Sequence, residues 1–149
     1  MYKAFLEYIA ENKLIKKGDR VLLAVSGGID SIVMAHLFLR AGISMGIAHC
    51  NFTLRGTDSD MDEALVKDFA ETHGIQYYSI RFNTKKYASE KGISIQMAAR
   101  ELRYSWFGKL LKENGYDAVA TAHNLNDNIE TFLINLVRGT GLTGLSGIK

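Results

Sequence analysis

The chain has 149 residues, of which 47% are hydrophobic and 23% charged, and it contains one cysteine. Its net charge of +2 is too small to argue by itself for a nucleic-acid partner. No apolar run approaches the roughly 18 residues that a membrane-spanning helix needs, and one cysteine cannot form an internal disulfide or a paired-cysteine metal site. We therefore expect a single cytoplasmic domain with its own hydrophobic core and no membrane segment.

The predicted elements alternate between helices and strands. Apolar periodicity and glycine breaks predict helices over residues 2–14, 30–40, 58–73, 94–114 and 126–138, and strands over residues 20–25, 44–49, 75–81 and 118–121. This alternation predicts an α/β fold, a parallel sheet with helices on both faces. In such sheets, ligands bind beyond the carboxyl ends of the strands. The first helix packs either on its own sheet or on a second copy of the chain, which leaves a homodimer open.

A glycine-rich turn, residues 26–31, follows the first strand and reads Ser-Gly-Gly-Ile-Asp-Ser. Adjacent glycines let the backbone approach an anion, and the helix that follows directs its N–H groups and positive dipole end to the same point. Asp30 makes electrostatic sense there if a divalent cation bridges it to phosphates. The sequence therefore predicts a phosphate site with a metal ion at Asp30. The alternative is a tight turn in which Asp30 only begins the helix.

Polar and basic residues follow the second strand. A guanidinium at Arg55 matches a phosphate or a polynucleotide backbone, and a solvated loop arginine is the alternative. His49 either contacts a substrate or hydrogen-bonds a loop carbonyl, and the sequence does not decide between the two. Residues 56–60 predict a turn and a helix start, to which we assign no chemistry.

Two arginines lie along one face of the long helix predicted over residues 94–114. Arg100 and Arg103 are three residues apart, beside an apolar stripe that we assign to the core. Aligned cations of this kind neutralise a pyrophosphate or bind RNA. The alternative pairs them with acids such as Glu101, in surface pairs that contribute little. We favour the functional interpretation, with Arg100 as the preferred residue.

The fourth strand leads into a second polar segment. His123, Asp127 and Glu130 follow one another at spacings of four and three residues, so a helix would project both carboxylates from one face. Paired carboxylates hold a metal ion, or bind an ammonium group and accept its proton. A helix cap formed by Asn124 and Asp127 competes with this interpretation, but it does not account for Glu130 or His123.

A glycine-rich segment closes the chain and begins with Arg138, Gly139, Thr140 and Gly141. A donor-rich segment of this kind folds over phosphates or a tRNA, and a frayed chain end is the alternative. Because so specialised a loop seldom ends a domain, we expect the chain to be the N-terminal part of a longer protein.

The glycine-rich turn resembles the PP-loop of the ATP pyrophosphatases. Together with residues 48–56, 98–104 and 122–141, it makes nearly the whole chain similar to the N-terminal domain of the tRNA(Ile)-lysidine synthase family. The resemblance implies a Rossmann-like ATP pyrophosphatase domain. Two positions depart from the family pattern, because Phe52 stands where many relatives carry histidine and Gln96 where many carry glutamate. These two differences argue against an obligatory catalytic role for residues 52 and 96. Neither position belongs to the PP-loop.

The resemblance implies a ligase that uses ATP, Mg²⁺ and free lysine to modify tRNA(Ile) with a CAU anticodon. ATP adenylates the oxygen on C2 of the wobble cytidine and releases pyrophosphate, and the lysine amine then displaces AMP. The implied ATP-binding residues are Ala24, Ser26, Gly27, Gly28, Ile29, Asp30, Ser31, Ala48 and Arg100, with Mg²⁺ at Asp30. The implied catalytic residues are Asp30, Arg100, His123, Asp127 and Glu130. The implied contacts to lysine or tRNA are His49, Arg55, Arg103, Asp127, Glu130, Arg138, Gly139, Thr140 and Gly141.

Other classes stay open at this point. Related enzymes that thiolate tRNA usually rely on several cysteines, and this chain has only Cys50. Amidotransferases of the superfamily need an ammonia source, and no glutaminase nucleophile is visible. A nucleotide-binding sensor without turnover would not need two carboxylates beside an anion site. A fold analogy alone does not fix a substrate, so the evidence for tRNA is the resemblance itself.

Overall fold

The computed structural model of the chain describes residues 1–124 and 132–139. Its centre is a five-stranded sheet with the order β3-β2-β1-β4-β5. The strands are β1 (Val21–Ala24), β2 (Met45–Asn51), β3 (Gln76–Arg81), β4 (Ala118–Asn124) and β5 (Phe132–Arg138). The strands β1 to β4 run parallel, and β5 pairs antiparallel with β4.

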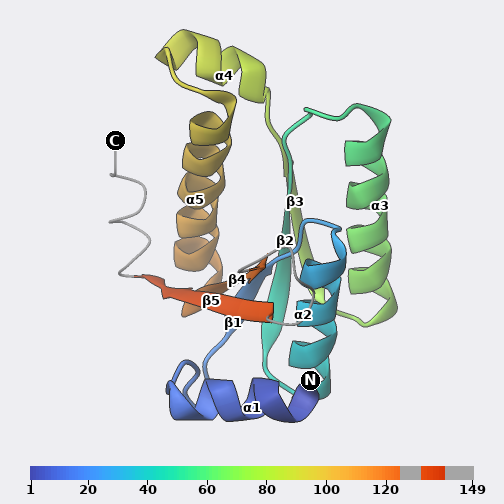
Figure 1. The fold of residues 1–149 in the computed structure, drawn as a ribbon, viewed down its shortest axis with the longest axis vertical. Coiled ribbons are helices and arrows are strands. Elements are labelled where there is room, and N and C mark those ends of the chain that lie inside the picture. The colour runs from blue at the N-terminus through green and yellow to red at the C-terminus, as the bar shows by residue number, and fades with distance from the viewer. Residues whose placement is uncertain (125–131, 140–149) are drawn as a thin grey trace.

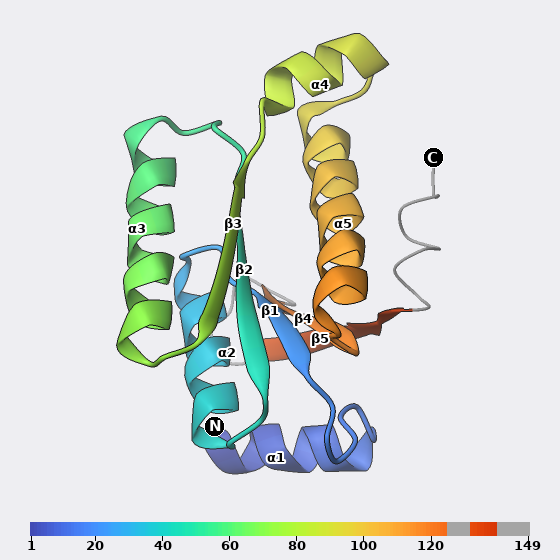
Figure 2. The ribbon, with the colours of Figure 1, turned by 180° about the vertical axis from the view of Figure 1, so that it is seen from behind.

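Helices cover both faces of this sheet (Figure 1). The helices are α1 (Tyr2–Glu11), α2 (Ile29–Arg40), α3 (Thr57–Thr72), α4 (Thr84–Lys91) and α5 (Ile95–Asn114). The helices α2 and α3 lie on one face and α5 on the other, while α1 crosses one end of the sheet (Figure 2). The predicted α/β class is therefore confirmed, with one antiparallel edge strand added to the parallel sheet.

The central strand β1 is buried on both faces. Val21 and Leu23 join the core beneath α1, α2 and α3, whereas Leu22 packs on the other face against Phe107 of α5. Val21, Leu22 and Leu23 are 0% exposed, and Phe107 is 1% exposed. A continuous apolar run is what a parallel strand covered on both faces requires. The turn that leaves the carboxyl end of β1 is thus held by a strand that is buried on both faces.

The first helix packs on its own molecule. Phe5 of α1 is 6% exposed, and its ring centroid lies 5.3 Å from that of Phe38 on α2. Of the two placements that the sequence left open, the structure shows the intramolecular one, and the question of a homodimer is not tested by it. Within the described ranges, no helix is long and apolar enough to cross a membrane.

The helix predicted over residues 126–138 is wrong for residues 132–138, because Phe132–Arg138 forms the edge strand β5, and residues 126–131 lie outside the described residues. A short apolar run fits a buried strand as well as a helix, and periodicity alone does not separate them. Pairing in the register Ala118↔Arg138 to Asn124↔Phe132 satisfies the backbone groups that β4 would otherwise leave open. The same pairing extends β4 three residues beyond its predicted end at Thr121.

The sequence analysis also missed the helix α4. Its signals are nonetheless local, since the side chain of Asn83 accepts a hydrogen bond from the Lys86 N–H at the first turn and Gly92 ends the helix at φ +65°. The helix has only eight residues and lacks an apolar stripe, which is why periodicity did not detect it.

Candidate active site

The glycine-rich turn connects the buried strand β1 to α2. Gly27 has a φ of +93°, and a Cβ atom at this position would lie 2.8 Å from the Cβ of Asp62 on α3. Both the left-handed backbone and the close approach require glycine. Gly28 forms the N-cap of α2 without any side-chain cap, so the first turn of the helix presents its N–H groups at the turn. The side chain of Ile29 is 79% exposed, so this position contributes its backbone to the turn.

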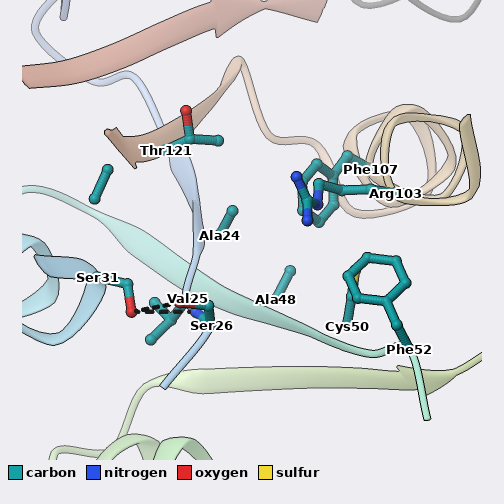
Figure 3. Close-up of a pocket in the computed structure, with 11 residues that line it drawn as sticks. Ala24, Val25, Ser26, Ser31, Ala48, Cys50, Phe52, Arg103, Phe107 and Thr121 are labelled. Atoms are coloured by element: carbon teal, nitrogen blue, oxygen red, sulfur yellow. Dashed lines mark hydrogen bonds between the residues drawn. The ribbon is translucent and has the colours of Figure 1, made fainter. Parts of the chain in front are cut away.

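Two serines brace the turn. The Ser31 hydroxyl donates to the Gly28 carbonyl at 2.8 Å and accepts from the Ser26 N–H at 3.1 Å. The Gly28 N–H in turn donates to the Ser26 hydroxyl oxygen at 3.3 Å, and the two hydroxyl oxygens lie 3.2 Å apart (Figure 3). Ser31 is 5% exposed. Its hydroxyl therefore holds the turn in one conformation.

Asp30 lies in the first turn of α2, where a helix favours negative charge. Within residues 1–124 and 132–139, no group of three histidine, cysteine or acidic side chains could hold a metal ion. Mg²⁺ commonly takes one or two carboxylates and completes its shell with phosphate oxygens and water. A single carboxylate beside a turn that presents helix N–H groups fits Mg²⁺ that binds together with a phosphate ligand, and does not form a protein metal centre by itself.

A pocket of about 220 Å³ opens where the carboxyl ends of β1, β2 and β4 meet. Ala24 of β1 is in register with Ala48 of β2 and with Thr121 of β4 (Figure 3). The strand β1 has β2 as its neighbour on one side and β4 on the other, so the strand order reverses direction at β1. Doubly wound sheets bind their ligands at such a switch point. The pocket is lined by Ala24, Val25, Ser26, Ser31, Ala48, Cys50, Phe52, Arg103, Phe107, Thr121 and Ala122.

The wall across the pocket from the sheet comes from α5 and from the end of β2. Arg103 and Phe107 reach in from α5, and the Arg103 guanidinium carbon lies 5.1 Å from the ring centroid of Phe52 (Figure 3). Burial raises the pKa of the nearby Cys50 thiol to about 12, although the charge of Arg103 opposes this shift. The thiol is therefore protonated near neutral pH and is not a nucleophile in this site.

His49 lies beneath the glycine-rich turn. Its side chain is buried, and the Nδ1–H donates to the carbonyl of Val25 at 2.8 Å. Its Nε2 is also buried and has no hydrogen-bond partner in the part of the chain that the structure describes. Because side chains alternate along a strand, His49 faces away from the pocket that Ala48 lines. The structure thus shows the loop-carbonyl bond that the sequence left as one alternative.

Arg55 lies outside the pocket, close to the outer side of the glycine-rich turn. Its Nη2 pairs with Oδ2 of Asp62 at 2.6 Å, and Asp62 is the residue that packs against Gly27. The side chain of Arg55 is 67% exposed. The geometry leaves its guanidinium within reach of solvent beside the turn, and its contact with phosphate or RNA stays a prediction.

The structure distinguishes the two arginines of α5. Arg103 lines the pocket, whereas Arg100 is exposed and lies over the ring of Tyr104, with 5.1 Å between its guanidinium carbon and the ring centroid. Arg100 is not among the residues that line the pocket, so its predicted contact with the α-phosphate stays a prediction.

Arg138 and Gly139 lie at the opposite end of the sheet from the glycine-rich turn. Arg138 is in register with Ala118, at the amino end of β4, and its Nη2 donates to Asp19 at 2.7 Å and to the Leu14 carbonyl at 2.8 Å. The Gly139 N–H donates to the carbonyl of Asp117 at 3.2 Å. The structure does not bring these two predicted contacts to the pocket.

The remaining predicted residues cannot be placed in the site. His123 belongs to β4, where its backbone is in register with Leu133, and its side chain is outside the described part of the chain. The predicted residues Asp127, Glu130, Thr140 and Gly141 also lie outside the described residues.

The sequence analysis missed seven residues of the site, which are Val25, Cys50, Phe52, Asp62, Phe107, Thr121 and Ala122. Thr121 and Cys50 could have been predicted, because each lies near the carboxyl end of a parallel strand, where such sheets bind ligands. Phe107 was assigned to no site because an aromatic residue in a helix is usually part of the core. Nothing in the sequence indicated that Asp62, which is 35 residues from Gly27, would pack against the turn.

Comparisons with known proteins agree on the kind of domain. A family model described as a PP-loop domain matches residues 2–149. The chain is 47% identical over 144 residues to a tRNA(Ile)-lysidine synthase of Bacteroides thetaiotaomicron, covering 97% of this chain and 34% of that protein. It is also 47% identical over 151 residues to a tRNA(Ile)-lysidine synthase of Chlorobaculum tepidum, covering 99% of this chain and 46% of that protein. The chain thus spans between a third and a half of the length of these relatives.

Solved structures share the fold at low sequence identity. The NMN synthetase of Francisella tularensis superposes with a TM-score of 0.59 at 20% identity, covering 79% of this chain and 51% of that chain. The NH3-dependent NAD synthetase of Campylobacter jejuni superposes with a TM-score of 0.61 at 17% identity, covering 79% of this chain and 53% of that chain. At this identity the likeness concerns the arrangement of the sheet and helices.

Proposed function

The chain belongs to the PP-loop domain family, and on this premise we propose that it is the ATP-using domain of an enzyme that makes lysidine on tRNA(Ile) with a CAU anticodon. The observation that carries the proposal is the braced glycine-rich turn at the switch point of the sheet, in a chain nearly half identical to proteins named tRNA(Ile)-lysidine synthase. A tRNA-modifying enzyme of this kind would work in the cytoplasm.

The glycine-rich turn would hold the pyrophosphate end of ATP. Its backbone is fixed by the Ser26 and Ser31 hydroxyls, so the N–H groups at the start of α2 need no rearrangement when phosphates arrive. Donors that are oriented in advance stabilise charge that develops on the leaving group. We propose that Mg²⁺ binds at Asp30 together with the phosphates, where it would supply further neutralisation of that charge.

The first chemical step would join the RNA to the α-phosphate. The oxygen on C2 of the wobble cytidine attacks the α-phosphorus, the bond to the bridging oxygen breaks, and pyrophosphate leaves with its electron pair. The small side chains of Ala24 and Ala48 leave space for the adenosine between the turn and α5. Arg100 remains our proposed contact to the α-phosphate, because it lies on α5 three residues before Arg103, which lines the pocket.

The second step would transfer lysine. The side-chain amine attacks C2 of the activated base, the bond from C2 to oxygen breaks, and AMP leaves. The amine must be neutral to attack, so a base has to take its proton. We propose Asp127 and Glu130 for binding the ammonium group, Glu130 for accepting the proton, and His123 as a further catalytic residue. The proposed contacts to tRNA are Arg55 and Thr140 with Gly141.

The proposal is tested by transfer of labelled lysine to unmodified tRNA(Ile) with a CAU anticodon. The full-length protein should incorporate lysine only with ATP present, and Asp30→Ala should lower incorporation at least about a hundredfold. Asp58→Asn is the matched control, because Asp58 is likewise an acidic residue in the first turn of a helix, α3, and has no proposed role in the site. If the unaltered protein bound ATP but incorporated no lysine, tRNA(Ile) with a CAU anticodon would be ruled out as its substrate.

A further inference from the structure

Two side chains hold the peptide unit at which the chain leaves β1 and enters the glycine-rich turn. Its carbonyl, that of Val25, accepts a hydrogen bond from the Nδ1–H of His49 at 2.8 Å. Its N–H, that of Ser26, donates to the Ser31 hydroxyl oxygen at 3.1 Å (Figure 3). Because a peptide unit is planar and rigid, holding both of its polar groups fixes the direction in which the chain enters the turn. His49 therefore acts on the same peptide unit as Ser31.

The imidazole of His49 carries a proton on Nδ1. A carbonyl oxygen only accepts hydrogen bonds, so the nitrogen that bonds to it is the donor. The second polar atom of the ring, Nε2, is buried without a partner in the part of the chain that the structure describes. A buried polar atom without a partner costs stability, and an apolar side chain at residue 49 would avoid this cost. The bond to the Val25 carbonyl therefore explains the imidazole better than packing does.

His49 approaches the turn from the face of the sheet that lies opposite the pocket. Its neighbours Ala48 and Cys50 line the pocket, whereas Ile47 belongs to the core beneath α2 and α3. Side chains alternate along a strand, so His49 shares the face of Ile47. It is also only 2% exposed. Any effect of His49 on a ligand in the pocket therefore passes through the backbone of the turn.

We propose that His49 is a positioning residue of the phosphate site. By holding the Val25 carbonyl, it keeps the glycine-rich turn in the conformation that presents its N–H groups to phosphates, and it does not itself touch the ligand. The inference rests on the proposed function, because it takes the phosphates of ATP to occupy the turn. A direct contact of His49 with lysine or RNA is the other role that the sequence left open, and the test separates the two.

The test uses two variants that divide the properties of the side chain. Asparagine carries its amide nitrogen on Cγ, as histidine carries Nδ1, so His49→Asn keeps the donor and loses the volume of the ring. His49→Leu fills more of the space and has no donor. ATP and inorganic tripolyphosphate, which has the phosphates and no base, are titrated by calorimetry into the full-length protein. His49→Leu should weaken the binding of both at least about fivefold, whereas His49→Asn should stay within about twofold of the unaltered protein.

A role in packing alone gives the reverse order, because leucine fills the core better than asparagine does. Weaker binding by His49→Asn than by His49→Leu would therefore overturn the proposal, as would equal weakening in both variants. Unchanged tripolyphosphate binding in His49→Leu would also overturn it, because the turn would then not depend on His49. Urea unfolding of both variants shows that affinity and stability follow different orders.

Thr84→Val is the matched control. The Thr84 side chain is buried, and its hydroxyl likewise donates to a loop carbonyl, that of Phe52, at 2.8 Å. Valine keeps the shape of the side chain and removes this bond. Because the Phe52 carbonyl is not part of the glycine-rich turn, tripolyphosphate binding should be unchanged in this variant. Weakening equal to that in His49→Leu would overturn the proposal, because any buried bond to a carbonyl would then have the same effect.

A spectrum of the full-length protein labelled with ¹⁵N in its histidines tests the bond directly. The signals that disappear in His49→Asn belong to His49, and they should show the proton on Nδ1 with and without ATP. A proton on Nε2 alone would overturn the proposal, because Nδ1 could not then donate to the carbonyl. Failure of the proposed function has a separate signature, in which the variants bind tripolyphosphate in the expected order while the unaltered protein transfers no lysine.

Discussion

Gly27 and Asp62 pack so closely that a Cβ atom at residue 27 would lie 2.8 Å from the Cβ of Asp62 and 3.0 Å from its Oδ1. Asp62 is held in this position by its ion pair with Arg55 at 2.6 Å. The glycine-rich turn is therefore enclosed between its own serine braces and a side chain of α3. Its shape depends on a contact between segments that are distant in the sequence.

Gly27→Ala should weaken ATP binding about tenfold or more, because the new methyl group must push the turn away from Asp62. Gly18→Ala is the matched control. Gly18 has a similar φ of +89° but no atom within 4 Å of an added Cβ, so this variant measures backbone strain alone, about 1–2 kcal/mol. Urea unfolding and ATP titration of both variants give the comparison. Equal ATP affinity in the two variants would show that the contact with Asp62 does not shape the turn.

Cys50 should resist alkylation in the folded protein. Burial raises the pKa of its thiol to about 12, so at about pH 8 the reactive thiolate is scarce. Iodoacetamide should modify it on the order of a thousandfold more slowly than in the urea-unfolded chain, and bound ATP should slow the reaction further because Cys50 lines the pocket. Since this is the only cysteine of the chain, mass spectrometry reads the rate directly. Equal rates in the folded and unfolded chain would contradict the burial of the thiol.

The pair of Asp19 and Arg138 should make stability depend on pH in acid. The hydrogen bond from Arg138, with a second one from the Lys16 N–H, holds the pKa of the Asp19 carboxyl below its usual value. A lowered pKa in the folded state adds stability above the unfolded pKa of about 4, and this stability is lost as the pH falls through the lower, folded pKa. The coupling between the two residues should be roughly 1 kcal/mol or less near pH 7.

A double-mutant cycle of Asp19→Asn and Arg138→Gln measures this coupling by urea unfolding at several pH values. The coupling energy should be constant from about pH 7 down to about pH 5 and should shrink below about pH 4. A coupling that grew toward acid would contradict the assigned cause.

The sequence predicted those parts of the molecule whose signals are local. The apolar run of β1, the adjacent glycines and the helix start at α2 stand next to one another in the chain, so the turn and its chemistry could be recognised before the fold was known. The secondary structure of Phe132–Arg138 is not decided by local sequence. Its apolar residues fit a helix or a strand, and pairing with β4 decided between them.

The site shows the same limit. A spacing of three residues correctly puts Arg100 and Arg103 near one face of α5, but the way α5 packs on the sheet decides that Arg103 lines the pocket. Likewise, the glycine-rich sequence that follows Arg138 predicts that this residue belongs to a phosphate-binding segment. Its partner Asp19 is 119 residues away, and only the sheet brings them together.

The most direct test of the account is the bond at which ATP is cleaved. With ATP labelled at the α- or the γ-phosphate, the full-length protein, unmodified tRNA(Ile) with a CAU anticodon and lysine, we predict AMP and pyrophosphate in equal amounts, with release dependent on the tRNA. ADP and inorganic phosphate as products, or pyrophosphate release that ignores the tRNA, would contradict it.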